Sequence, residues 1–127
     1  IRIEMEYEVQ KPGFALFPHF QLHNETGVYL FVAIEQDTTW QGRSRPKGRY
    51  ITTACIPGNL LNEGTVFVDP VMRTIEPDIL HFCEENAVTF EAIEVSSDNP
   101  TRGGYTKGIP GAVRPKLKWS TEFRPND

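Results

Sequence analysis

Apolar and polar residues alternate one by one over long stretches of this chain. In residues 1–9, IRIEMEYEV, every odd position is apolar and every even position is charged. Because successive side chains of a β-strand point to opposite faces, this pattern predicts a strand with one face in a core and the other in water. The chain contains six further segments that we predict to be strands, at residues 14–23, 28–35, 49–56, 65–75, 87–95 and 112–123.

Turn-forming residues separate these segments. The sequence NETG joins residues 14–23 to residues 28–35, so this pair is expected to form a β-hairpin. Apolar positions in residues 77–86 have helical spacing, which predicts a short helical turn there. Pro70 lies inside the strand predicted at residues 65–75, and since proline has no N–H for a sheet ladder, we expect an edge strand or a bulge there. Short strands with almost no helix are typical of an antiparallel sandwich or barrel.

Two adjacent leucines interrupt a stretch that otherwise has the composition of a turn. In IPGNLLNEG, residues 56–64, a Pro-Gly precedes Leu60 and Leu61, and a glycine follows them. A sandwich has open ends between its sheets, and a turn placed there can insert apolar side chains into the gap. We therefore expect both leucines to be buried as a plug at one end of the core.

Composition limits the classes of protein to which the chain can belong. A length of 127 residues is typical of one domain with its own core. The net charge of −4 argues against a general nucleic-acid surface, and no apolar stretch is long enough to span a membrane. Cys55 and Cys83 have apolar neighbours, so we expect buried, reduced thiols, which fits the cytoplasm. Because the chain begins within a strand pattern, we expect it to be part of a longer protein.

Several motifs, taken in order, resemble a known family. LHNETGVYLF, PKGRYITTACIP, IPGNLLNEGTVFV, VTFEAIEV and RGGYTKGIPGAVRPKLKW follow one another as in the C-terminal domains of Wzt-type proteins. These proteins are the ATPase subunits of ABC transporters that export O-antigen polysaccharides. The resemblance covers nearly the whole chain, and it implies that residues 1–127 form a single antiparallel β-sandwich of immunoglobulin-like or jelly-roll topology.

The resemblance also implies a function, which is non-catalytic binding of an O-antigen-type polysaccharide as the export substrate of the transporter. No cofactor is implied. The partners would be the polysaccharide, the membrane subunit of the transporter and a second copy of the chain, on the cytoplasmic side of the inner membrane. The chain has no GxxxxGK[ST] phosphate loop, so an ATPase domain would have to lie upstream. The alternative is a structural module that dimerises or docks the ATPase and binds no sugar.

Sugar binding requires flat aromatic faces and planar polar side chains, and the predicted hairpin offers both. One face of this hairpin, predicted to carry Phe17, His19, Gln21, Tyr29 and Phe31 together, is expected to be the glycan surface. The alternative is that this face packs against another part of the protein. Trp40, in the loop QDTTWQGRSRPKG, is a further candidate, for which the alternative is packing on the core. The predicted carbohydrate-binding residues are Phe17, His19, Gln21, Tyr29, Phe31 and Trp40.

Other chemistry is less well supported by the pattern. His19 and His23 would be about 13 Å apart on one strand, too far to share a metal ion, so no metal site is predicted. The cysteines have no basic flank, which disfavours a nucleophile and therefore an enzyme. Weaker sugar-contact candidates are Tyr105 and, for an acidic sugar or phosphate, the guanidinium groups of Arg43, Arg45 and Arg49.

The last predicted strand bears on the oligomeric state. Residues 96–111 are rich in Gly and Pro and span up to about 50 Å when extended, so residues 112–123 can reach a neighbouring subunit. Exchange of an identical element is a simple route to a two-fold dimer. We expect a homodimer in which residues 112–123 pair with the other subunit.

Overall fold

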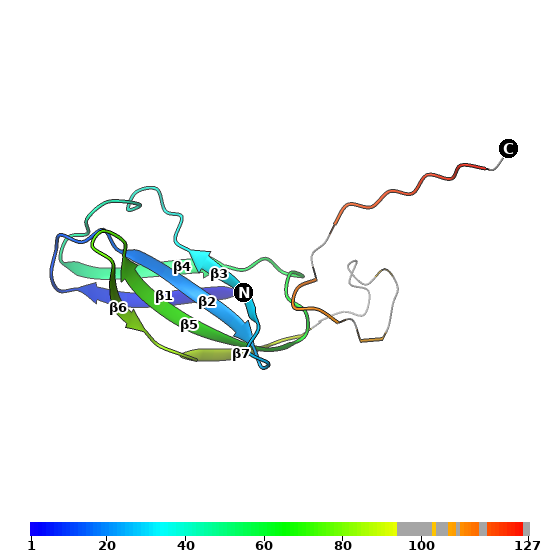
Figure 1. The fold of residues 1–127 in the computed structure, drawn as a ribbon, viewed down its shortest axis with the longest axis horizontal. Coiled ribbons are helices and arrows are strands. Elements are labelled where there is room, and N and C mark those ends of the chain that lie inside the picture. The colour runs from blue at the N-terminus through cyan, green and yellow to red at the C-terminus, as the bar shows by residue number, and fades with distance from the viewer. Residues whose placement is uncertain (94–102, 104–106, 109, 115–116, 126–127) are drawn as a thin grey trace.

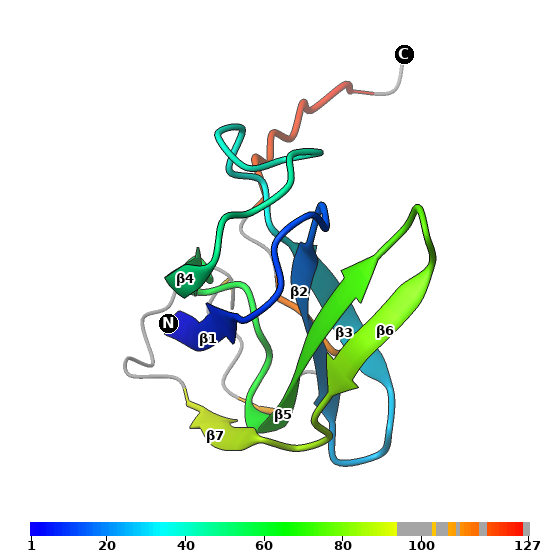
Figure 2. The same ribbon diagram turned by 90° about the vertical axis from the view of Figure 1, so that its left-hand side faces the viewer.

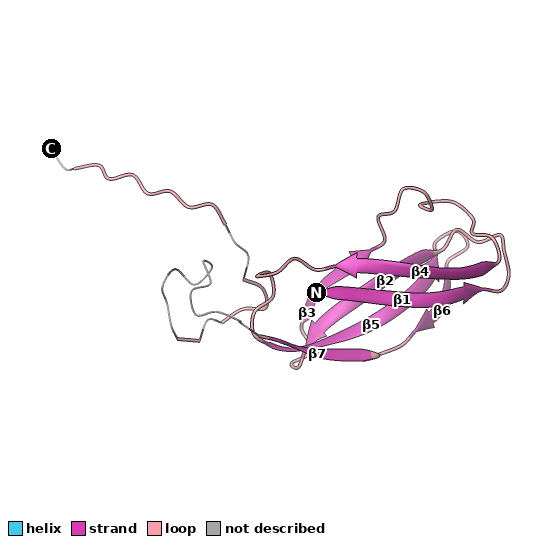
Figure 3. Ribbon diagram, turned by 180° about the vertical axis from the view of Figure 1, so that it is seen from behind, coloured by secondary structure: helices cyan, strands magenta, loops and turns pink. Residues whose placement is uncertain are grey.

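The computed structural model describes residues 1–93, 103, 107–108, 110–114 and 117–125, and within them it contains strands and no helix (Figures 1 and 3). The expectation of an all-β, antiparallel sandwich is confirmed. The strands are β1 (Arg2–Val9), β2 (Phe17–Asn24), β3 (Tyr29–Ile34), β4 (Gly48–Cys55), β5 (Gly64–Thr74), β6 (Ile79–Cys83) and β7 (Val88–Ala92).

The strands form two sheets of unequal size. β1 and β4 pair antiparallel along their full lengths as a two-stranded sheet. The larger sheet has the order β3-β2-β5-β6, and β7 also pairs with β5. Figure 2 shows the two layers, with β1 and β4 on one side of the core and β2, β3, β5 and β6 on the other. The small sheet therefore covers only part of the larger one.

The core lies between the sheets, where the alternating patterns place their apolar sides. Ile3 and Met5 are buried while Glu4 and Glu6 between them are exposed, as the period of two predicts. Leu22 in β2 is fully buried, and burial of one such side chain contributes roughly 1.5–3 kcal/mol to stability. The buried residues of the core cluster are Ile3, Met5, Phe20, Leu22, Ile56, Val66, Val68, Met72 and Ala92.

The predicted hairpin forms, but its second strand has a bulge that sequence reasoning did not anticipate. Leu22 pairs with Phe31 and His23 pairs with Tyr29, so Leu30 is an extra residue. Cross-strand partners share a face, and Phe31 therefore points with Leu22 towards the core. The prediction that Phe31 shares a face with His19 is wrong, because the extra residue reverses the alternation beyond it.

Pro70 lies in the centre of the larger sheet, so the expectation of an edge strand is wrong. β5 pairs with β2 on one side, and on the other side with β7 at Gly64–Val68 and β6 at Val71–Thr74. Pro70 falls in the break between these two partners, where its carbonyl accepts a hydrogen bond from the amide of Glu84. Since the N–H and C=O of a strand residue point the same way, the missing N–H also falls in this break.

Residues 77–86 do not form the predicted helical turn. They contain the edge strand β6, which pairs with β5 with a register shift between Met72 and Arg73. An edge strand with a bulge loses strict alternation, and Leu80 and Phe82 are both exposed. This irregularity produced the apparent helical spacing.

Leu60 and Leu61 are half-buried against the core, so they close the end of the sandwich less completely than expected. They also hold a distant part of the chain. The amide of Arg114 donates to the carbonyl of Leu60 at 2.6 Å, and the amide of Asn62 donates to the carbonyl of Ala112 at 3.2 Å. Leu61 and Val113 form an isolated antiparallel bridge.

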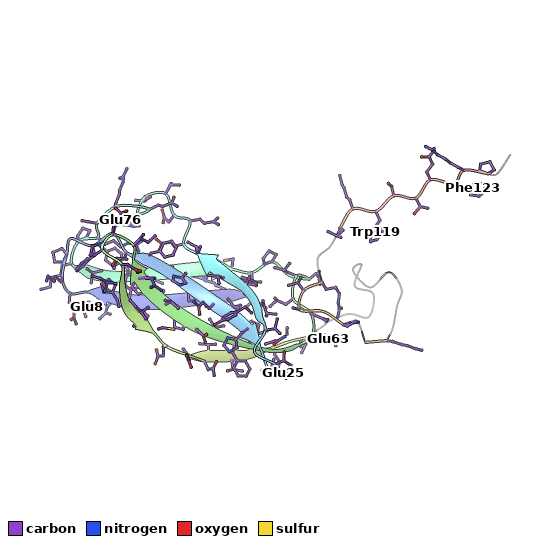
Figure 4. All side chains as sticks on the ribbon, viewed as in Figure 1. Glu8, Glu25, Glu63, Glu76, Trp119 and Phe123 are labelled. Atoms are coloured by element: carbon purple, nitrogen blue, oxygen red, sulfur yellow. The ribbon has the colours of Figure 1, made fainter. Side chains whose placement is uncertain are left out.

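The last predicted strand is not formed within the described residues 112–114 and 117–125, beyond the bridge at Val113. Residues 117–125 extend away from the sheets, as Figure 4 shows for Trp119 and Phe123. Trp119 is 86% exposed and Phe123 is 85% exposed. The expected burial of this apolar side is thus not found within a single chain. Most of the preceding connection, with Tyr105, lies outside the described residues.

Both cysteines are exposed, so the prediction of buried thiols is wrong. Cys55 ends β4 opposite Arg2, on the outward face of the small sheet, and Cys83 ends the edge strand β6. Their apolar sequence neighbours point to the opposite faces of these strands. Partial burial and the carboxylates of Asp69 and Glu85 raise the pKa of the Cys83 thiol, which lowers its thiolate fraction at neutral pH.

A candidate binding cleft between β3 and β4

A cleft of about 560 Å³ opens where the edge of the large sheet faces the edge of the small one. Its volume is within the range of roughly 300–1,000 Å³ that is usual for ligand sites. β3 and the residues after it form one wall, and β4 forms the other. The lining residues are Pro18, Phe20, Val32, Ala33, Ile34, Glu35, Gln36, Asp37, Trp40, Arg45, Tyr50, Ile51, Thr52, Thr53 and Ala54.

The backbone of β3 presents unpaired groups to this cleft. The amide of Glu35 donates to the carbonyl of Pro18 at 3.1 Å, which makes Glu35 and Pro18 a hydrogen-bonded pair of the ladder. Such pairs alternate with pairs whose N–H and C=O groups point away from the partner strand. Val32 and Ile34 belong to the second kind. Among the described residues no strand pairs with this side of β3, so its backbone groups face the cleft.

The opposite wall has the same property. Ile1 and Ile56 exchange two backbone hydrogen bonds, of 2.7 and 3.0 Å, in the register of the β1–β4 ladder. By the same alternation, Ile51 and Thr53 point their N–H and C=O groups away from β1. The side of β4 that faces the cleft has no partner strand in the described part of the chain. Two strand edges thus face each other across the cleft.

A buried ion pair supports the base of the cleft. Arg45 is 1% exposed, and its guanidinium donates to the carboxylate of Glu35 and to the Tyr7 hydroxyl. The Thr52 hydroxyl donates to the second oxygen of Glu35 at 3.0 Å. These contacts join the small sheet, through Tyr7 and Thr52, to Glu35, which follows β3 directly and bonds to Pro18 of the large sheet, so they connect the two sheets.

The partners of Arg45 keep its guanidinium protonated despite its burial. Burial acts to lower the pKa of the guanidinium, but the hydrogen bonds and negative charge of Glu35, together with Tyr7, outweigh it and leave the pKa raised. Arg45 therefore stays protonated and compensates Glu35. It is a positioning residue for the cleft and exposes almost no surface to a ligand.

The aromatic rings of Trp40 and Tyr50 line the cleft beside this ion pair. Trp40 meets Tyr50 edge to face, with ring centroids 5.4 Å apart and planes at 87°. Tyr50 in turn stacks on Tyr7 at 5.5 Å. The guanidinium carbon of Arg45 lies 5.9 Å from the Trp40 ring centroid, within the range of a cation–π contact. Trp40 is half-buried, so it is held in place and still presents surface to solvent.

The loop that carries Trp40 is locally ordered by Asp37. The carbonyl of Asp37 accepts from the amides of Trp40 and Gln41, at 3.3 and 3.1 Å. Its carboxylate accepts from the amide of Thr39 at 2.9 Å. This turn brings the exposed polar side chains of Gln36 and Asp37 to the same cleft as the indole ring.

The residues predicted from the sequence to bind sugar are divided between two faces. Phe17, His19 and Gln21 lie in a row on the outer face of the large sheet, with Val32 and Ile34 rather than Phe31 beside them. His19 is only 7% exposed. The ring of Phe17 packs against its imidazole, with the two ring centroids 5.2 Å apart.

Tyr29 is the most accessible of the predicted residues on this outer face, at 61% exposure, and it lies beside His23. Among the predicted residues only Trp40 belongs to the cleft. The sequence reasoning missed Glu35, Asp37 and Tyr50. A signal was present in the polar run Glu-Gln-Asp, residues 35–37, directly after an apolar strand.

The three arginines that were weaker candidates for binding an acidic ligand either pair with a glutamate or lie outside the cleft lining. Arg45 is buried against Glu35, and Arg49 lies 3.4 Å from Glu6 on the outward face of the small sheet. Arg43 is exposed but is not among the lining residues of the cleft.

Further comparisons give no relative from which to transfer a role. No family model matches the chain, and no curated protein matches it. Within the described residues, no group of three or more His, Cys, Asp or Glu side chains is arranged to hold a metal ion. The part of the chain that the structure describes also has no helix long and apolar enough to cross a membrane.

Proposed function

We propose that this domain binds a polysaccharide of the O-antigen type without catalysing a reaction, and that the cleft between β3 and β4 is the site. The observation that carries the proposal is the Trp40 ring, which is held by Tyr50 and Arg45 at the edge of a solvent-open cleft of about 560 Å³. An immobilised aromatic ring contacts the C–H face of a sugar at little entropic cost.

The motif order supports the biological setting. The chain resembles the C-terminal domains of Wzt-type transporter subunits, so the bound polysaccharide would be an export substrate. An ATPase domain elsewhere in the full-length protein would then connect the domain to the membrane subunit, at the cytoplasmic side of the inner membrane. This setting is part of the proposal.

The test uses the two tryptophans of the chain, Trp40 and Trp119. The purified domain is titrated with surface polysaccharide from its source strain by calorimetry, as wild type and as Trp40→Ala, Trp119→Ala and Tyr29→Ala variants. We expect Trp40→Ala to weaken binding at least tenfold and Trp119→Ala to leave it within twofold. A loss confined to Tyr29→Ala would move the site to the outer face, and absence of binding by the wild type would refute the function.

The second candidate function is a dimerisation or docking module with no sugar binding. Its support is the exposure of Leu117, Trp119 and Phe123 on an extended segment, together with the edges of β3 and β4, which have no partner strand among the described residues. Homodimerisation through residues 112–123 fits this candidate and is compatible with the first one.

A further inference from the structure

We infer that the cleft is selective for a neutral glycan with free hydroxyl groups, which the edges of β3 and β4 bind through their backbones. This inference rests on the proposed function and names the substrate class of the same site. Two independent properties of the cleft carry it, namely the sign of its accessible charge and the kind of hydrogen-bonding groups on its walls.

The accessible charge of the cleft is negative. Three of its lining residues carry a formal charge at neutral pH, namely Glu35, Asp37 and Arg45. Arg45 is 1% exposed and pairs with Glu35, so these two charges compensate each other. Asp37, which is exposed, remains. Among the described residues that line the cleft, a carboxylate or phosphate on the ligand would meet no accessible cation and would lie next to a like charge, which disfavours acidic sugars.

The walls of the cleft match hydroxyl groups. Val32 and Ile34 on one side, and Ile51 and Thr53 on the other, each direct one N–H donor and one C=O acceptor towards the cleft, as the alternation of the two ladders requires. A hydroxyl group both donates and accepts, so a row of hydroxyls satisfies both kinds of backbone group. A carboxylate only accepts and would leave the carbonyls without a donor.

The chemical arm of the test uses wild-type domain and modified polysaccharide. Surface polysaccharide from the source strain is used untreated, after reduction of any carboxyl groups to alcohols, after oxidation of primary hydroxyls to carboxylates, and after O-methylation. We expect the untreated and reduced polymers to bind equally, and their affinities to change less than twofold between 20 and 300 mM NaCl. The oxidised and O-methylated polymers should each bind at least tenfold more weakly.

The genetic arm separates backbone from side chain. Val32→Pro removes the N–H that faces the cleft but no ladder hydrogen bond, because Val32 is in a pair that does not bond to β2. Val32→Ala shortens the side chain and keeps the N–H. We expect Val32→Pro to bind at least fivefold more weakly than Val32→Ala, with Ile51→Pro and Ile51→Ala as the equivalent pair on β4. Circular dichroism confirms that each variant is folded.

The outcomes separate the inference from the function beneath it. If wild-type domain binds no form of the polymer, the proposed function fails and the inference with it. If it binds, but binds the oxidised polymer as well as or better than the untreated one, or loses affinity on carboxyl reduction, only the neutral selectivity is refuted. Equal affinities of folded Val32→Pro and Val32→Ala, repeated at Ile51, would refute backbone recognition.

Discussion

Replacement of Arg45 by methionine tests whether the buried ion pair with Glu35 holds the two sheets in their relative positions. Methionine has an unbranched apolar side chain and no charge, so the change removes the donor and leaves the carboxylate of Glu35, whose side chain is 12% exposed, without its cation. Breaking a buried pair on one side typically costs 3–5 kcal/mol. Because Glu35 keeps some contact with water and with Thr52, we expect the lower end, about 3 kcal/mol.

This loss is a substantial fraction of the stability of a small domain, which is about 5–15 kcal/mol. For a chain of this length it corresponds to a fall of roughly 10 °C in Tm. Urea and thermal unfolding followed by circular dichroism measure both quantities. The control is the double variant Arg45→Met, Glu35→Met, in which no unpaired charge remains. The double variant should therefore be more stable than the sum of the two single changes predicts, by about 2 kcal/mol.

Two results would refute this reasoning. A loss below about 1 kcal/mol for Arg45→Met would place the pair among weakly contributing surface contacts. Strict additivity of the two single variants would mean that Glu35 and Arg45 act independently, and the link between the sheets would have to come from the core alone.

Two further predictions concern the open end of the sandwich and the extended segment. Leu61→Ala should destabilise by about 1–2 kcal/mol in urea unfolding, less than the 2–5 kcal/mol of a fully buried leucine, because Leu61 is half-buried; a loss above 3 kcal/mol would contradict the observed exposure. Light scattering should give a dimer for the intact chain and a monomer after deletion of residues 112–127; a dimer that survives the deletion, or an intact chain that stays monomeric at high concentration, would rule out strand exchange.

The sequence was sufficient for the fold class because alternation is a direct consequence of the strand backbone. Residues 1–9 read as half-buried from their pattern alone, and β1 has that burial pattern. Errors arose where a bulge shifts the pattern by one residue. The extra residue Leu30 reverses which side chains of β3 point to the core. The register shift after Met72 gave the apolar residues of β6 an apparent helical spacing. A bulge is set by pairing with another strand, so it leaves little trace in the strand itself.

The candidate site was harder to predict for a related reason. Trp40 could be singled out because a tryptophan in a polar loop is unusual. Arg45, five residues later, looked like part of the same solvated loop, and nothing in its neighbours indicates that it is buried against Glu35 and Tyr7. Its burial depends on Glu35 at the start of the same loop and on Tyr7 in the distant strand β1, which meet it only in the folded domain.

The cleft itself follows from the unequal sizes of the two sheets. A two-stranded sheet cannot cover a larger one, and in the part of the chain that the structure describes the edges of β3 and β4 remain open across from each other. Unpaired strand edges usually promote aggregation unless something occupies or blocks them. Here the same edges lie beside a supported tryptophan and an acidic turn, in a cleft of ligand size. A polymer of hydroxyl groups would satisfy the backbone groups of these edges as a neighbouring strand does.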